Sequence, residues 1–193
     1  MKTRTLSLFA LLVCSVPAIA HSGHLPANSF SGGILHPLLG LDHLLAMIAV
    51  GLWAAQLGGR SRWLVPLAFV ATMFLGGLLG ARGLVVPMVE QGIALTVMLL
   101  GLVIAFSLRG RAWMPATVVA VFALMHGAAH GAEIPDAGAF LPYGVGFVFT
   151  TAMLHCAGIL LGEGLAALVR REAISACGGG IAVAGLFLLV ALV

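Results

Sequence analysis

Most of this chain consists of apolar stretches of roughly 20 residues, a length that spans a bilayer, separated by short connections rich in Gly, Pro and Arg. Of its 193 residues, 62% are hydrophobic and only 8% are charged, whereas about 25% of the residues in a soluble domain are charged. Such segments cross the hydrocarbon core as α-helices, because a helix satisfies its own backbone hydrogen bonds. The sequence therefore predicts an all-α integral membrane protein, with the lipid bilayer as its principal partner.

Six apolar segments after the N-terminal region predict a bundle of six transmembrane helices. We place them at residues 34–56, 63–80, 85–108, 114–132, 139–168 and 176–193. No soluble domain is left over, so we expect residues 21–193 to form one transmembrane domain. The sequence carries no signal for a particular oligomeric state.

The first twenty residues predict a secretory signal peptide. Lys2 and Arg4 precede an apolar run at residues 6–16, and Ala18-Ile19-Ala20 has the small-residue pattern of a cleavage site. The run is shorter than the roughly 20 residues that a transmembrane helix needs. Cleavage would make His21 the N-terminus, and the alternative is an uncleaved membrane anchor.

Positive charge follows alternate spans and predicts the orientation of the bundle. Arginine pairs follow spans one, three and five, whereas the other side of the membrane carries one arginine and two acidic residues. The pairs are Arg60 with Arg62, Arg109 with Arg111 and Arg170 with Arg171, and the opposite side has Arg82, Glu133 and Asp136. The positive-inside rule places the pairs in the cytoplasm and both termini outside. An outward N-terminus also agrees with a cleaved export signal, which would release residue 21 on the outer side.

The same charges exclude a nucleic-acid partner. The formal net charge of +3 includes Lys2 and Arg4 of the leader, and the mature chain is close to neutral. A nucleic-acid interface would need clustered Lys and Arg, and the sequence contains no such cluster.

Ionisable side chains inside the apolar segments are the candidate functional residues. They cost free energy in hydrocarbon, so several of them together normally face one another or a polar path. Imidazole and carboxylate groups are the ligands that borderline divalent transition metals prefer. The candidate metal-binding residues of the spans are His36, Asp42, His43, His126, His130, Glu133 and His155.

The spacing of these residues predicts their depth. With Pro37 in the first turn of span one, His36 would lie at the outer rim and His43 roughly 10 Å deeper. His126 and His130 are four residues apart and share one helical face. His155 would lie roughly 24 Å along span five, beyond the midplane, and Glu90 and Glu163 would extend the path.

Small residues beside the histidines predict close helix packing. Gly40, Gly127 and Gly131 adjoin the candidate ligands, and Gly76 and Gly80 have the spacing of a helix-packing motif. Close approach of the helices would bring ligands from different spans together.

Three stretches carry a resemblance to a known family. Residues 36–43 read His-Pro-Leu-Leu-Gly-Leu-Asp-His, residues 126–133 read His-Gly-Ala-Ala-His-Gly-Ala-Glu, and residues 146–158 contain Thr150, Thr151 and His155. The first two resemble the H-P-x-x-G-x-D-H and H-G-x-A-H-G-x-E motifs of the HupE/UreJ family of nickel and cobalt permeases. The resemblance implies import of Ni²⁺, or Co²⁺ in some members, across a bacterial inner membrane for hydrogenase, urease or cobalamin-dependent enzymes. The outward N-terminus would then be periplasmic.

We therefore expect a permease and not an enzyme, with the metal ion as cargo and no permanently bound cofactor. His21, His24 and His36 would collect the ion outside, and His155 would pass it inward. The residues that would replace its water are Asp42, His43, His126 and His130. The chain has no P-loop, so direct coupling to ATP is not expected.

Two alternatives remain open at this stage. An intramembrane hydrolase could use a His-bound Zn²⁺ to activate water, although the sequence lacks an H-E-x-x-H motif. A sensor or structural subunit could bind a metal ion without moving it.

Overall fold

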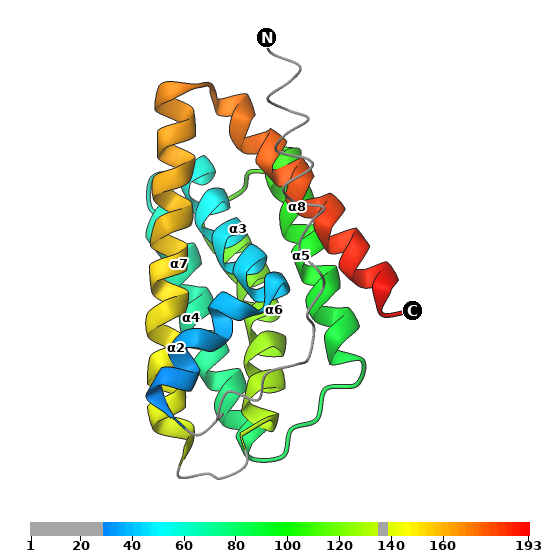
Figure 1. Ribbon diagram of the computed structural model, residues 1–193. Helices are drawn as coiled ribbons and strands as arrows, with labels where there is room; N and C mark the ends of the chain where they lie inside the picture. Colours follow the sequence, from blue (N-terminus) through cyan, green and yellow to red (C-terminus); the bar gives the residue numbers. More distant parts are fainter. Residues whose placement is uncertain (1–28, 135–138) are drawn as a thin grey trace.

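The computed structural model describes residues 29–134 and 139–193 of the chain, and these parts form seven α-helices and no strand. The helices are α2 (Phe30–Leu39), α3 (Leu41–Leu57), α4 (Ser61–Ala81), α5 (Val89–Ala105), α6 (Trp113–Ala132), α7 (Phe140–Leu168) and α8 (Arg171–Ala191). Figure 1 shows α3 to α8 as a bundle, with α2 lying across its lower part. The leader, His21, His24 and Asp136 lie outside the described residues.

Helix length supports a multi-pass membrane protein without confirming six spans. Four helices (α4, α6, α7 and α8) are long and apolar enough to cross a bilayer, and the bent pair of α2 and α3 makes five if it counts as one span. With 17 residues, α5 is apolar but shorter. The six-helix arrangement therefore stays a prediction, whereas the all-helical class is confirmed.

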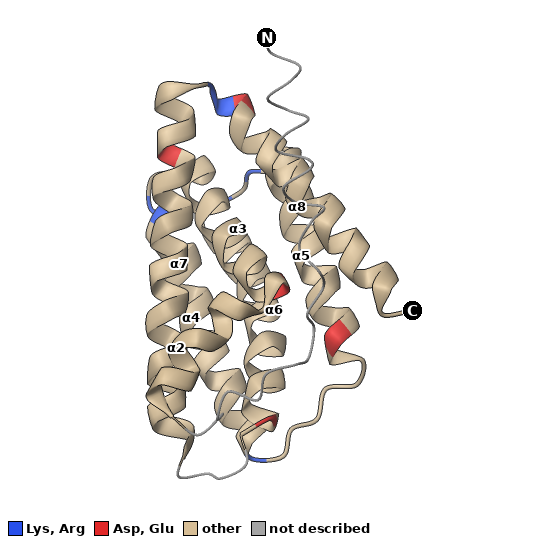
Figure 2. Ribbon diagram, in the orientation of Figure 1, with Lys and Arg blue, Asp and Glu red and all other residues tan. Residues whose placement is uncertain are grey.

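The surface of the bundle fits a lipid environment. Large apolar side chains are exposed on the outer faces of several helices, among them Leu67, Val121, Phe149, Leu160 and Phe187. Figure 2 shows most of the blue arginine positions in the upper half of the view, toward the end of the bundle where α7 connects to α8, and one at the opposite end. The arginine pairs therefore share one end of the bundle, whereas the cytoplasmic location of that end stays a prediction of the positive-inside rule.

Glycines bring α4 and α6 into backbone contact. A Cβ on Gly127 would collide with the carbonyl oxygen of Met73, and one on Gly131 would collide with that of Gly77. On the facing helix, a Cβ on Gly76 or Gly80 would meet the backbone of α6. The prediction that these residues allow close helix packing is confirmed.

Glycines also allow close backbone contact in two further helix pairs. Gly51 of α3 lies against the backbone of α7 at His155 and Gly158, and Gly101 of α5 lies against Ala182 of α8. Because only hydrogen occupies these positions, helices from distant parts of the chain approach closely enough for short polar side chains to meet.

The first predicted span is broken and not continuous. Between α2 and α3 the chain turns by 83°, with Gly40 in an extended conformation (φ −81°, ψ 116°) at the junction. Pro37 lies inside α2 and not in a first turn, so that expectation is wrong. The new helix is favoured by Asp42 in its first turn, where a negative charge stabilises the positive end of the helix dipole.

Candidate metal site

Three histidines from three helices meet inside the bundle. His36 comes from α2, His43 from α3 and His130 from α6, and one ring nitrogen of each lies within 4.8 Å of the others. The ring centroids of His36 and His43 lie 4.5 Å and 4.4 Å from that of His130. We call these three residues the histidine cluster. Three imidazoles at this separation can act as three of the ligands of a transition-metal ion.

Asp42 orients one member of the cluster. The Nδ1 atom of His43 lies 2.7 Å from Asp42 Oδ1, so the ring donates its Nδ1 proton to the carboxylate and keeps a lone pair on Nε2. The same oxygen accepts the backbone N–H of His43 at 2.8 Å. A carboxylate behind a histidine fixes the ring and raises its basicity as a metal ligand. A Cβ on Gly40 would lie 2.8 Å from His43 Nδ1, so glycine leaves room for this pair.

His130 faces His43 nitrogen to nitrogen. Their Nε2 atoms are in direct contact, as hydrogen-bond partners whose donor and acceptor roles depend on the tautomer of each ring. On the other side of the His130 ring, Glu133 Oε2 lies 3.6 Å from Nδ1. Glu133, half exposed, and Asp42 therefore stand behind cluster histidines, where they can offset the charge of a bound cation.

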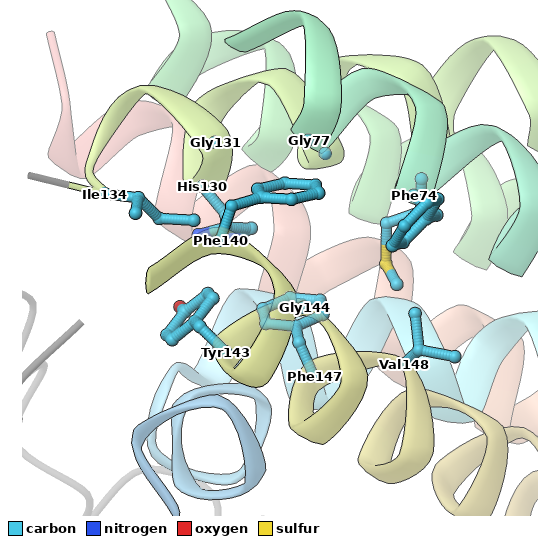
Figure 3. Close-up of a pocket in the computed structure, with 12 residues that line it drawn as sticks. Phe74, Gly77, His130, Gly131, Ile134, Phe140, Tyr143, Gly144, Phe147 and Val148 are labelled. Atoms are coloured by element: carbon cyan, nitrogen blue, oxygen red, sulfur yellow. The ribbon is translucent and has the colours of Figure 1, made fainter. Parts of the chain in front are cut away.

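Aromatic residues of α7 form a wall beside the cluster, which the sequence reasoning missed. The rings of Tyr143 and Phe147 lie 6.0 Å and 5.8 Å from that of His36, and Phe147 lies 4.8 Å from His130. Figure 3 shows Phe140, Tyr143 and Phe147 bordering a small cavity that His130 also lines. Its volume of about 30 Å³ leaves room for roughly one water molecule. The only signal in the sequence was an aromatic spacing of three to four residues.

His126 lies next to the cluster, one helical turn from His130. Its ring centroid lies 5.5 Å from that of His43. The Nδ1 atom lies 3.0 Å from the carbonyl oxygen of Phe122, and because a carbonyl only accepts, Nδ1 carries the proton and Nε2 keeps a lone pair. This Nε2 atom is buried and has no hydrogen-bond partner among the described residues.

His155 stands apart from the cluster. It is 1% exposed, and neither ring nitrogen finds a hydrogen-bond partner in the described parts of the chain. Its nearest aromatic neighbour is Phe69 of α4, at 5.1 Å between centroids and almost perpendicular. Buried polar nitrogens without partners are rare in folded proteins and point to a role beyond packing.

A larger cavity opens at the arginine-bearing end of the bundle. It has a volume of about 580 Å³ and is lined by Gln56, Arg62, Glu163 and residues of the loop that follows α5 and of the start of α8. Arg62 Nη2 lies 2.9 Å from Glu163 Oε1. Glu163 thus lies at the arginine-bearing end of the bundle, paired with an arginine.

The depth order expected from the sequence changes in one respect. His43 does not lie deeper than His36 along a straight helix, because the bend at Gly40 folds α2 back over the start of α3 and brings the two rings to 5.6 Å. His126 flanks the cluster, and His155 lies outside it, against Phe69. The fold and site together define a multi-pass helical membrane protein with a histidine-rich interior.

Comparison with known proteins identifies the family. The sequence profile described as HupE / UreJ protein matches residues 9–188. Protein HupE of Rhizobium leguminosarum bv. viciae is 45% identical, over 97% of this chain and 96% of its own length. The chain therefore belongs to the HupE/UreJ family. No solved structure matches it.

Family membership confirms the resemblance found in the two His-rich motifs. The family consists of metal permeases and accessory proteins, so the expectation that this protein is not an enzyme is also confirmed. The alternative of an intramembrane hydrolase is wrong.

Proposed function

We propose that this protein imports a divalent transition-metal ion, Ni²⁺ or else Co²⁺, across the bacterial inner membrane. The observation that carries the proposal is the meeting of three imidazole nitrogens from α2, α3 and α6 within 4.8 Å, with Asp42 behind one of them. Neutral imidazole suits Ni²⁺ and Co²⁺, whereas an oxygen-only site would suit Mg²⁺ or Ca²⁺.

The arrangement of the other histidines supports movement of the ion and not storage alone. Beyond the cluster, His126 presents an unpartnered nitrogen, His155 presents two, and the cavity beside Glu163 lies at the arginine-bearing end of the bundle. In this proposal that end faces the cytoplasm. An ion held only for structure would need one closed ligand set. A series of incomplete sites instead lets an ion bind and leave.

Membrane potential is a sufficient driving force in this proposal. Each elementary charge gains about 2.3 kcal/mol per 100 mV, so a dication entering a negative-inside cell gains roughly 4.6 kcal/mol. Outside the membrane, cleavage after Ala20 would leave His21 at the N-terminus. Its free amine and imidazole, with His24, would then raise the local concentration of the ion.

Transport by the purified full-length protein tests the function. Reconstituted into liposomes with a negative-inside potassium diffusion potential, it should accumulate radioactive ⁶³Ni²⁺, and unlabelled Co²⁺ should compete. The mass of the same preparation reports whether the leader is removed after Ala20. A protein that binds Ni²⁺ in detergent but accumulates none in liposomes would be a sensor or structural subunit instead.

Acidification outside the liposomes should weaken uptake. A protonated imidazole has no lone pair for a metal, so protons and Ni²⁺ compete for the same nitrogens. At fixed membrane potential and fixed free Ni²⁺, lowering the outside pH from about 7.5 to 5.5, the range in which free imidazole becomes charged, should raise the apparent KM. Faster uptake in acid would instead indicate proton-coupled symport.

A further inference from the structure

Phe69 contacts two histidines from different helices inside the bundle. Its ring lies 6.0 Å from that of His126 and 5.1 Å from that of His155. It belongs to α4, whereas the two histidines belong to α6 and α7. Phe69 is fully buried, as is His126. The same aromatic ring therefore packs against the histidine beside the cluster and against the histidine that stands apart from it.

The two histidines beside Phe69 have polar atoms that nothing in the described structure satisfies. The Nε2 atom of His126 and both ring nitrogens of His155 are buried without hydrogen-bond partners. A dehydrated cation needs such donors on both sides of an apolar constriction, because the constriction itself offers none. Both histidines that contact Phe69 have such donors.

We propose that Phe69 is the barrier residue of the permeation path and that its side chain sets the rate at which an ion passes from His126 to His155. This inference rests on the proposed function. The face of a phenyl ring attracts a cation only weakly, so the ion stops there until the side chain moves. The same ring keeps a continuous water column from forming, and thereby blocks proton leak.

Changing the size of this side chain in both directions provides the test. With ⁶³Ni²⁺ at saturating concentration, Phe69→Leu should increase the uptake rate at least roughly fivefold and Phe69→Trp should decrease it by a similar factor. Ni²⁺ affinity, measured by calorimetry in detergent, should stay within about twofold for both, because neither touches the three cluster nitrogens. Simple destabilisation would lower uptake in both variants.

A matched control separates the barrier from general loosening of the core. Leu100 is also fully buried, but it belongs to α5, which supplies none of the histidines. Leu100→Ala should therefore leave the uptake rate per folded molecule unchanged. Uptake by Phe69→Leu and Phe69→Trp that equals that of the wild type, or that falls together in both, would overturn the proposal.

Proton leak distinguishes a failure of this inference from a failure of the proposed function. A pH-sensitive dye inside the liposomes should report faster proton entry for Phe69→Ala than for the wild type, in the absence of any metal. If the wild type accumulates no metal but Phe69→Ala leaks protons, the barrier is correct and the cargo is wrong. If the wild type transports Ni²⁺ and Phe69→Ala neither leaks nor speeds uptake, the barrier is wrong.

Discussion

Replacing His43 by Gln is expected to abolish metal uptake. His43 is the central member of the histidine cluster, since its Nε2 atom contacts that of His130 and its Nδ1 proton goes to Asp42. Losing one of three imidazole donors should weaken Ni²⁺ binding by more than the roughly 10–100-fold that loss of an outer partner typically costs. His36→Gln and His130→Gln should likewise weaken Ni²⁺ binding and abolish uptake. Calorimetry in detergent measures the affinity of the three variants, and ⁶³Ni²⁺ accumulation at matched protein levels measures their uptake.

Three further variants show how the effect on binding and uptake depends on the position of the residue. Asp42→Asn removes a charge behind His43 and should cost roughly 10–100-fold in affinity. His155→Gln should leave affinity unchanged and slow uptake, because His155 is not one of the three residues of the histidine cluster. Cys156→Ala is the control, since its thiol is a potential metal ligand that faces outward on α7, and it should change neither. Normal uptake by all three cluster variants would show that the cluster is not on the path.

The Gly131→Ala variant should lose both stability and metal binding. A Cβ at this position would collide with the carbonyl oxygen of Gly77, and backbone cannot swing aside as a flexible side chain can. Overpacking of this kind lowers the free energy of unfolding by about 1–3 kcal/mol. Because His130 is the preceding residue of α6, separating α6 from α4 would also displace one nitrogen of the cluster.

Gly180→Ala is the matched control for this effect. A Cβ on Gly180 of α8 would meet no atom within 4 Å, and alanine stabilises an exposed helical position by roughly 0.5–1 kcal/mol relative to glycine. Thermal unfolding in detergent should therefore be unchanged or slightly raised for Gly180→Ala and lowered for Gly131→Ala. Equal unfolding temperatures for the two variants would mean that α4 and α6 can separate without cost.

Much of the site could be predicted from the sequence, because a histidine in an apolar segment has few stable alternatives to meeting another polar group. This reasoning selected His36, His43 and His130, which come together in the structure, and the neighbouring glycines, which bring α6 against α4. It did not distinguish residues that can bind the metal directly from residues that orient those ligands by hydrogen bonds. Asp42 was grouped with the histidines as a candidate ligand, whereas in the structure it bonds to the proton-bearing nitrogen of His43.

The sequence by itself determined the lipid environment, the all-helical class and the residues able to bind a metal. Each of these follows from the length of an apolar segment or from the chemistry of a side chain, and both are local properties. Only the tertiary structure decided which of those residues share a site. The 83° turn at Gly40 sets His36 beside His43, and Phe69, an ordinary apolar residue in the sequence, contacts both His126 and His155. Both depend on how helices distant in the chain pack, and the periodicity of a single helix carries no information about its neighbours.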